Sequence, residues 1–241
     1  MKYLLCISYD GSKYYGSQIQ KDKVTVLGQM TKVISKIYKC NIKLLASSRT
    51  DRGVHAKEQY VTFETNNIIE GINIPAAINS LIDKSIYVKS CRVVNDKFNV
   101  RYDVEKKEYV YKINVKEYNP IEKDYCLQYN NYINLKLIRK ASKYLVGVHD
   151  FRSFTTEPKE NSIRDIKYIK IKKIGSYVYI YICADGFLKY MIRNIIGLFL
   201  EINEGKKSVN DINYIIDARD RTVASRCEKS CGLYLNKIIF K

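Results

Sequence analysis

Residues 108–115 read Glu-Tyr-Val-Tyr-Lys-Ile-Asn-Val, and this stretch decides the fold class of the chain. Successive side chains of a strand point to opposite faces of a sheet, so Tyr109, Tyr111, Ile113 and Val115 share one face. That face is aromatic and apolar, whereas the opposite face carries charged and polar residues as well as one valine. The pattern predicts a strand with one buried face.

Toward the N-terminus, the hydrophobic pattern alternates between the period of a strand and that of a helix. Leu27, Met30 and Ile34 recur at helical spacing behind Thr25, a residue type that caps helices. The patterns predict strands at about 3–9, 42–45, 59–65 and 85–94, and helices at about 26–37 and 75–81. The first half is therefore α/β or α+β.

Toward the C-terminus, strands come in adjacent pairs. The patterns predict strands at about 164–174, 177–184 and 232–240, helices at about 135–145, 187–203 and 208–217, and a loop that begins at His149 and Asp150. Adjacent strands favour antiparallel pairing, so we expect an α+β fold with a largely antiparallel central sheet and helices on one side. We expect two subdomains, residues 1–104 and 105–241, without a flexible hinge, since the chain has only 3 Pro and 11 Gly.

The composition indicates an anionic partner. The 241 residues include 42 Lys and Arg against 25 Asp and Glu, a formal charge of +17, with 46% hydrophobic residues. These values exclude a disordered tail, a collagen and an acidic module. A surplus of positive charge attracts polyanions, of which nucleic acid is the usual intracellular one. The alternative is a lysine-rich and isoleucine-rich composition that follows from an AT-rich genome.

The cysteines and the apolar runs predict a soluble cytoplasmic protein without a metal site. The 7 Cys have scattered spacings, Cys227 and Cys231 form a CxxxC pair, and only His55 and His149 could assist them. No zinc framework can be assembled from this set, and small reduced core residues are the favoured interpretation. The apolar runs at the N-terminus and near 177–184 are too short for a signal peptide or a membrane span.

Asp51 is the first candidate for chemistry. It lies in the polar loop 47–56 between Arg49 and Arg52. A nearby guanidinium lowers the pKa of a carboxyl group, and such a carboxylate can act as a nucleophile or an anchored base. From these residues alone, a salt bridge within the loop is the stronger interpretation. His55 is interpreted as a hydrogen-bonding partner rather than a catalyst.

Six motifs in order then resemble the TruA family of tRNA pseudouridine synthases. The loop resembles that family's GRTDAGVHA signature. The motifs are Tyr9-Asp10-Gly11-Ser12 with Tyr14, Gly16 and Gln18; Arg49 to Ala56 with Gln59 and Phe63; Lys107 to Tyr111; Gly147 to Phe151 with Phe154; Gly186-Phe187-Leu188 with Met191 to Asn194 and Gly197; and Gly232 to Leu235. They span nearly the whole chain, which makes the resemblance very specific.

The resemblance implies a role for individual residues. Asp51 matches the family's nucleophile, which attacks the target uridine so that the base detaches, turns and rejoins the sugar through carbon. Arg49 matches the arginine that pairs with it, and Tyr109 matches the tyrosine packed against the flipped base. The matched motifs also assign substrate binding to Phe187, Arg193, Leu235 and His55. This isomerisation needs neither a metal nor a cofactor.

The resemblance further implies a fold, a substrate and an assembly. Two α/β subdomains would share the central sheet, with the C-terminal one completing an active-site cleft on the face opposite the helices. The substrate would be a uridine of the anticodon stem-loop of tRNA, at positions 38–40, and the enzyme would be a homodimer. Flipping the base out of its stack requires stacking surfaces and phosphate contacts, which 22 Tyr and the +17 charge can supply.

Three residues depart from the family pattern and leave alternatives open. Ser48 replaces a Gly, Ser17 replaces the usual Trp, and Arg52 replaces a small residue. Loss of an aromatic residue would remove a stacking platform. A diverged paralogue that modifies other uridines, or an RNA-binding or RNA-folding factor that retains the fold, are the alternatives. A metal-dependent nuclease is disfavoured, because Asp51 has no acidic partner nearby in sequence.

Overall fold

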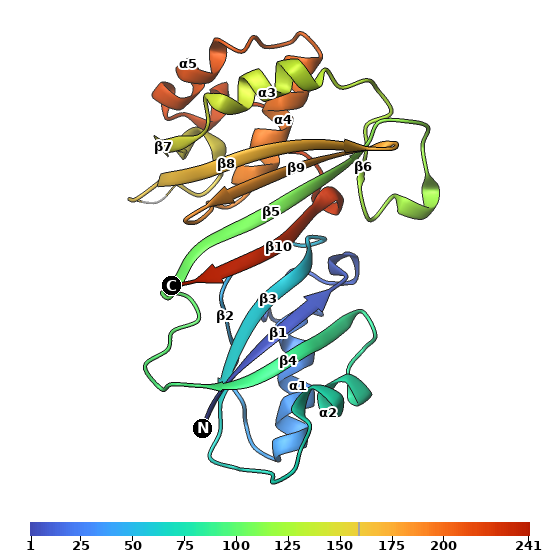
Figure 1. Cartoon of the computed structure of the whole chain (residues 1–241), viewed down its shortest axis with the longest axis vertical. Coiled ribbons are helices and arrows are strands. Elements are labelled where there is room, and N and C mark those ends of the chain that lie inside the picture. The colour runs from blue at the N-terminus through green and yellow to red at the C-terminus, as the bar shows by residue number, and fades with distance from the viewer. Residues whose placement is uncertain (159) are drawn as a thin grey trace. The chain divides into compact units, whose positions relative to one another are not determined.

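The structure, a computed structural model, describes residues 1–158 and 160–241. The chain forms two compact units, Met1–Glu105 with Tyr234–Lys241, and Lys106–Leu233 (Figure 1). The sequence-based boundary after residue 104 lies beside this one, but the last strand, expected in the second subdomain, belongs to the first unit. The reason is that β10 (Leu233–Phe240) pairs in parallel with β3 (His55–Glu64), which lies far from it in sequence.

The sheet of the first unit has the strand order β4-β1-β3-β10, and β2 pairs with β3. The remaining strands are β1 (Lys2–Tyr9), β2 (Leu45–Ala46) and β4 (Ile86–Val94). Their pairs are antiparallel, and only the contact of β3 with β10 is parallel among the pairs described here. Tyr3 of β1 stacks on Phe63 of β3 with ring centroids 4.9 Å apart, so this face of the sheet packs into the core.

Two helices cover one face of this sheet (Figure 1). They are α1 (Val26–Tyr38) and α2 (Ile74–Leu81). The Thr25 side chain accepts a hydrogen bond from the Gly28 amide, as expected of a helix cap. Met30 and Ile34 of α1 are fully buried, which confirms the face predicted from their spacing.

The sheet of the second unit has the order β5-β9-β8-β7, with β6 beside β5. The strands are β5 (Val104–Asn114), β6 (Leu127–Gln128), β7 (Gly147–Asp150), β8 (Ile163–Ile174) and β9 (Tyr177–Ala184). The pairs along β5-β9-β8-β7 are antiparallel, and β6 is parallel to β5. Tyr109, Tyr111 and Ile113 are buried, so the aromatic face predicted for residues 108–115 is a core face. Val110 and Asn114 on the opposite face are buried as well, so the strand has more than the one buried face that was predicted.

Three helices gather on one side of this second sheet (Figure 1). They are α3 (Leu135–Lys143), α4 (Met191–Asn203) and α5 (Asp211–Ala218). Helix α4 is buried on almost every side, and even its Asn194 is fully inaccessible to solvent. Short 3₁₀ helices connect these elements at Gly11–Lys13, Pro120–Glu122, Arg152–Phe154, Arg221–Val223 and Ser230–Gly232.

The α+β class with mostly antiparallel pairing is confirmed, whereas several element bounds were predicted wrongly. Strand β3 begins at His55 rather than near 59, and β2 is shorter than predicted. His149 and Asp150 lie in strand β7 and not in a loop, because they pair with β8. Helix α4 begins at Met191 and not near 187, because Tyr190 has a left-handed backbone with φ of 62°. None of the helices described, over residues 1–158 and 160–241, is long and apolar enough to span a membrane.

Candidate active site

Asp51 lies in a tight turn that leads directly into strand β3. The amide of Val54 donates a hydrogen bond to the Asp51 carbonyl oxygen over 3.1 Å. Gly53 has φ of 76°, a left-handed conformation that glycine adopts without steric cost. The side chain of Asp51 is half-buried. We name residues 47–54 the Asp51 loop.

Ser17 clamps the Asp51 loop from the opening segment of the chain. Its hydroxyl oxygen accepts a hydrogen bond from the Thr50 amide over 2.9 Å, and its own amide donates to the Thr50 carbonyl oxygen over 3.0 Å. The Thr50 hydroxyl is also hydrogen-bonded to the Tyr9 hydroxyl over 2.7 Å. Ser17 is only 1% exposed. The residue that replaces the family's usual Trp is therefore a buried clamp and does not present a surface for stacking.

His55 fastens the same two segments at a second point. The Gly11 amide donates to His55 Nδ1 over 3.1 Å, and the Asp10 carboxylate lies 3.3 Å from the same nitrogen. Both contacts converge on this nitrogen and fix the orientation of the ring. The ring is 2% exposed and stacks on Tyr234 of β10 with centroids 4.5 Å apart. In this structure His55 positions the loop and does not face solvent.

Gln59 supports the first residues of the Asp51 loop. Its side-chain oxygen accepts from the Ser47 hydroxyl over 2.5 Å, and its side-chain nitrogen donates to the Ser48 carbonyl oxygen over 2.8 Å. Gln59 is 1% exposed and belongs to β3. The loop is thus held to the sheet by hydrogen bonds on both sides of Asp51.

The cations of the loop lie at its surface. Arg49 is exposed, and its predicted pairing with Asp51 stays a prediction. The Arg52 guanidinium lies 4.4 Å from the centroid of the Tyr15 ring, and Lys23 Nζ lies 4.8 Å from the same centroid. Cations over a ring face are attracted by its negative charge density. The sequence suggested that Arg52 adds charge beside Asp51, and the structure shows that its guanidinium stacks on Tyr15.

Leu235 is the remaining candidate of the first unit. It lies on β10 opposite Ala56, the second residue of β3. The structure therefore brings Leu235 close to the end of the Asp51 loop although the two are far apart in sequence. Its side chain is fully buried.

In the second unit, Tyr109 and Phe187 are brought together. The Phe187 ring meets the Tyr109 ring edge to face, with centroids 5.2 Å apart and an angle of 82°. Tyr109 is 5% exposed, whereas Phe187 is half-buried. The two predicted substrate residues form one aromatic pair, in an arrangement that aromatic rings favour.

Arg193, on the first turn of α4, is held in two ways. Its Nε donates to the Glu228 carbonyl oxygen over 2.5 Å, and the Glu228 amide donates to the Arg193 carbonyl oxygen over 3.2 Å. Its guanidinium also lies 4.8 Å from the centroid of the Tyr190 ring. The side chain is therefore oriented by the segment 226–231, which we name the Arg226 loop.

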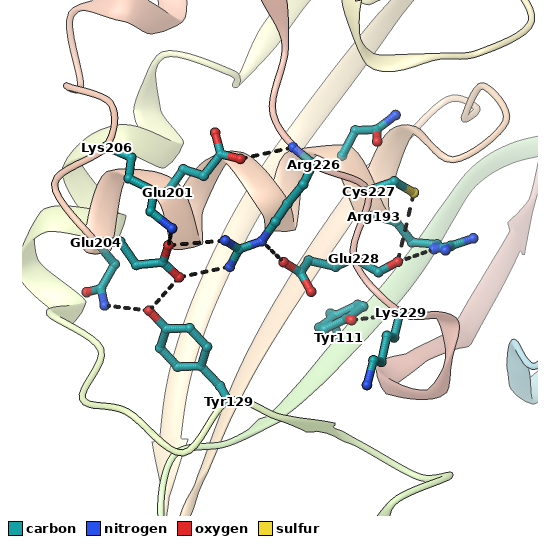
Figure 2. Close-up of polar contacts among 12 residues, drawn as sticks. Tyr111, Tyr129, Arg193, Glu201, Glu204, Lys206, Arg226, Cys227, Glu228 and Lys229 are labelled. Atoms are coloured by element: carbon teal, nitrogen blue, oxygen red, sulfur yellow. Dashed lines mark hydrogen bonds and ion pairs between the residues drawn. The ribbon is translucent and has the colours of Figure 1, made fainter.

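An ionic network anchors the Arg226 loop to α4 (Figure 2). Arg226 forms two hydrogen bonds with the Glu204 carboxylate, over 2.8 and 3.1 Å, and its Nε donates to the Glu228 carboxylate over 2.6 Å. Lys206 adds a contact of 2.7 Å to Glu204. The hydrogen bonds from Arg226, the largest contribution, lower the pKa of Glu204 to about 2. The pairing in turn raises the pKa of Arg226.

Sequence reasoning missed the residues that hold these two loops. Ser17 was noticed only as a departure from the family pattern, and Glu204, Arg226 and Glu228 gave no signal, because charged residues in a basic chain are usually solvated. Their partners are distant in sequence, so no local spacing could have identified them. In addition, no three His, Cys, Asp or Glu side chains among residues 1–158 and 160–241 cluster as metal ligands would.

Comparison with known proteins gives consistent matches. Residues 141–241 match a family model described as tRNA pseudouridine synthase. Over 240 residues, the chain is 36% identical to tRNA pseudouridine synthase A of Thermoanaerobacter sp. (strain X514), covering 98% of both chains. It is 36% identical to tRNA pseudouridine synthase A 2 of Clostridium perfringens, again covering 98% of both. It is 34% identical to tRNA pseudouridine synthase A of Borreliella burgdorferi, and this match covers 100% of this chain and 99% of that one.

Similarity to solved structures is much lower. The chain resembles a chain of an H/ACA RNP bound to a substrate RNA containing 2'-deoxyuridine, with a TM-score of 0.38 and 14% identity. The match covers 81% of this chain and 41% of that chain.

Proposed function

The chain belongs to the tRNA pseudouridine synthase A (TruA) family and isomerises uridine in tRNA; from this premise we propose that Asp51 is its nucleophile. The proposal rests on the hydrogen bonds that hold the Asp51 loop in place. Ser17 and Gln59 hold the backbone on both sides of Asp51, while the carboxylate itself stays half-buried. A fixed backbone keeps a nucleophile in one attack geometry.

The reaction balances without any further reagent. The Asp51 carboxylate attacks the target nucleotide and forms a bond to it, and the bond between the sugar C1′ and the base N1 breaks with its electron pair left on N1. After the base turns, a bond forms between C1′ and C5, the bond to Asp51 breaks and restores the carboxylate, C5 loses its proton and N1 gains one. Product and substrate contain the same atoms and electrons, so we propose that Asp51 acts without a metal or a cofactor.

The other site residues are proposed in supporting roles. Arg49 pairs with Asp51, as the matched motif implies. The Tyr109 ring packs against the flipped base, and its edge-to-face contact with Phe187 supports this role by fixing the ring. Arg193 binds the substrate, and its fixed orientation over Tyr190 is consistent with this role. Leu235 and His55 shape the end of the Asp51 loop, next to the bound nucleotide.

We also propose the part of tRNA that is modified and the state of the enzyme. The target is a uridine in the anticodon stem-loop, and the enzyme acts in the cytoplasm as a homodimer. A protomer of 28.2 kDa is small relative to a tRNA, so a symmetric pair offers the longer binding surface. Light scattering at micromolar concentration should give twice the protomer mass. A protomer mass that does not change with concentration would contradict the dimer.

Asp51→Asn is the experiment that tests the proposal. The substitution preserves shape and removes the nucleophilic oxyanion, so we expect no pseudouridine in anticodon stem-loop RNA while the Kd for tRNA stays within about threefold. Asp96→Asn, an exposed Asp of the same unit, is the matched control and should retain full activity. Pseudouridine formation by purified Asp51→Asn above an enzyme-free blank would refute the assignment. Product at uridines outside the anticodon stem-loop would refute only the proposed target.

A further inference from the structure

A cationic cavity lies within the second unit, and Arg193 is its one lining residue to which a role was assigned above. It has a volume of about 520 Å³ and is lined by Tyr118, Lys123, Asp124, Arg193 and Lys229, among others. Three cations thus face one carboxylate. The volume lies within the range of small-molecule and nucleotide sites, and the charge selects for an anion.

The two walls of the cavity have fixed backbones. In the first wall, the amides of Tyr125 and Cys126 donate to the Glu122 carbonyl oxygen over 2.9 and 3.1 Å. The Glu122 carboxylate is in turn bound by Lys112 Nζ at 3.0 Å. In the second wall, the Tyr111 hydroxyl donates to the Lys229 carbonyl oxygen over 2.6 Å. The backbone beside Lys123 and at Lys229 is therefore held in place.

A direct contact joins the two walls. The Cys231 thiol donates to the Cys126 carbonyl oxygen over 3.5 Å, so residues 105 positions apart in the chain meet at the cavity. Both cysteines line it. Burial raises the pKa of Cys126 to about 11 and raises that of Cys231 as well, so both are neutral thiols near pH 7 and add no negative charge.

The cations of the cavity are available to a ligand. Lys123 and Lys229 are exposed, and neither forms an ion pair with any residue in the described part of the chain. Arg193 uses its Nε for the Glu228 carbonyl oxygen, which leaves its two terminal nitrogens for other partners. Figure 2 shows its guanidinium pointing away from the cluster of Arg226 and Glu204. Tyr118, which is 58% exposed, offers an aromatic face at the same cavity.

We propose that this cavity is a subsite for one nucleotide of the substrate RNA other than the target uridine. Its phosphate binds Lys123, Lys229 and the terminal nitrogens of Arg193, and its base stacks on Tyr118. Arginine and lysine are the usual phosphate ligands, and stacking on an aromatic ring is the common way to hold an unpaired base. The inference rests on the proposed function, because it assigns a second contact to the same RNA.

The test compares two double variants of equal charge. Lys123→Gln with Lys229→Gln removes two of the three cations of the cavity and leaves Arg193 in place. Lys140→Gln with Lys173→Gln removes two exposed lysines of the same unit that lie outside it. The Kd for tRNA is measured over a range of salt, together with the single-turnover rate at saturating tRNA. Thermal melts establish that both proteins are folded.

We expect the cavity double variant to bind tRNA about tenfold more weakly and to lose about one unit of the slope of log K against log salt, the value of one phosphate contact. In the control double variant, the changes in the Kd for tRNA and in the salt slope should each be less than half of those in the cavity double variant. Tyr118→Leu should weaken binding about fivefold without changing the slope, because stacking involves no counterion. That result distinguishes a nucleotide from a bare phosphate.

Equal affinities and slopes for the two double variants would overturn the subsite. A Tyr118→Leu protein that binds as the wild type does would overturn the stacked base and leave only an anion site. This interpretation requires that the wild-type enzyme forms pseudouridine in the same tRNA. If the wild type forms none in any tRNA, the proposed function has failed, and the affinity measurements still decide whether the cavity binds RNA.

Discussion

The Asp51 loop and the Arg226 loop are packed in the same way but are fixed by different chemistry. Each passes over a glycine: a Cβ added to Gly11 would lie 2.0 Å from the Val54 carbonyl oxygen, and one added to Gly197 would lie 1.8 Å from the Arg226 carbonyl oxygen. The Asp51 loop is then held by hydroxyl, amide and imidazole groups, whereas the Arg226 loop is held by ion pairs.

This difference teaches where charge is useful in a basic protein. The side chains of Ser17 and Gln59, which hold the Asp51 loop, are uncharged, so Arg49 remains the cation proposed to act on the Asp51 carboxylate. In the Arg226 loop, the ion pairs of Arg226 fix the backbone and leave the exposed Lys229 for the proposed subsite. We therefore expect the two loops to respond alike to steric change and differently to acid.

The largest effect should come from filling the two glycine contacts. Gly11→Ala and Gly197→Ala each force backbone against backbone, and we expect each to cost about 3 kcal/mol of unfolding free energy. Gly71→Ala and Gly205→Ala are the controls, since a Cβ at either site meets nothing within 4 Å. These controls should cost only about 1 kcal/mol, because their φ values are positive. Urea denaturation measures all four, and equal costs would contradict the close approach.

Arg226→Gln should have the second-largest effect on the unfolding free energy. It removes two hydrogen bonds to Glu204 and one to Glu228, and the Arg226 side chain is 41% exposed, so solvent screening limits the expected loss to about 2 kcal/mol. Hydrogen exchange should rise in residues 190–204 and 226–231 and stay unchanged in residues 9–18 and 47–60. Arg219→Gln, which removes a more exposed ion pair with Asp150, should cost less than about 0.5 kcal/mol. Equal exchange in the two loops would show that the ion pairs are not the anchor.

The third-largest effect should be a pH dependence of the unfolding free energy that arises from the Arg226 loop. The pKa of Glu204 is lowered from 4.5 to about 2 in the folded chain, so its ionised form stabilises the fold. A lowered pKa contributes stability that is fully present above pH 4.5 and is lost as the pH falls toward 2. The difference in unfolding free energy between wild type and Glu204→Gln should therefore be about 1 to 2 kcal/mol at pH 7 and should shrink below pH 4.5. A difference that is independent of pH would contradict the pairing.

The smallest effect should come from Ser17→Ala. It leaves the buried Thr50 amide without its hydroxyl acceptor, which should cost about 1 kcal/mol and speed hydrogen exchange at Thr50. Ser90→Ala, at an exposed position of the same unit, should have an effect below about 0.5 kcal/mol. Unchanged exchange at Thr50 would show that the clamp is not needed to order the Asp51 loop.

Local periodicity predicted most elements of both units. The alternation over residues 108–115 gave a strand with a buried aromatic face, and the spacing of Leu27, Met30 and Ile34 gave helix α1. These predictions succeeded because a repeat within one element depends only on which side faces the core. Element ends were less predictable: Tyr190 adopts a left-handed backbone before α4, which no pattern in residues 187–203 indicated.

The sequence by itself determined the motifs, and with them the family and Asp51 as the candidate nucleophile. Only the tertiary structure decided what holds those motifs: Ser17 on Thr50, His55 on Gly11, and the Arg226 loop on α4. The physical reason is that a pattern shows which face of an element is buried but not which distant segment covers it. Hydrogen bonds between residues 22 to 44 positions apart leave no periodic trace, because each partner is specified by the packing of the whole unit.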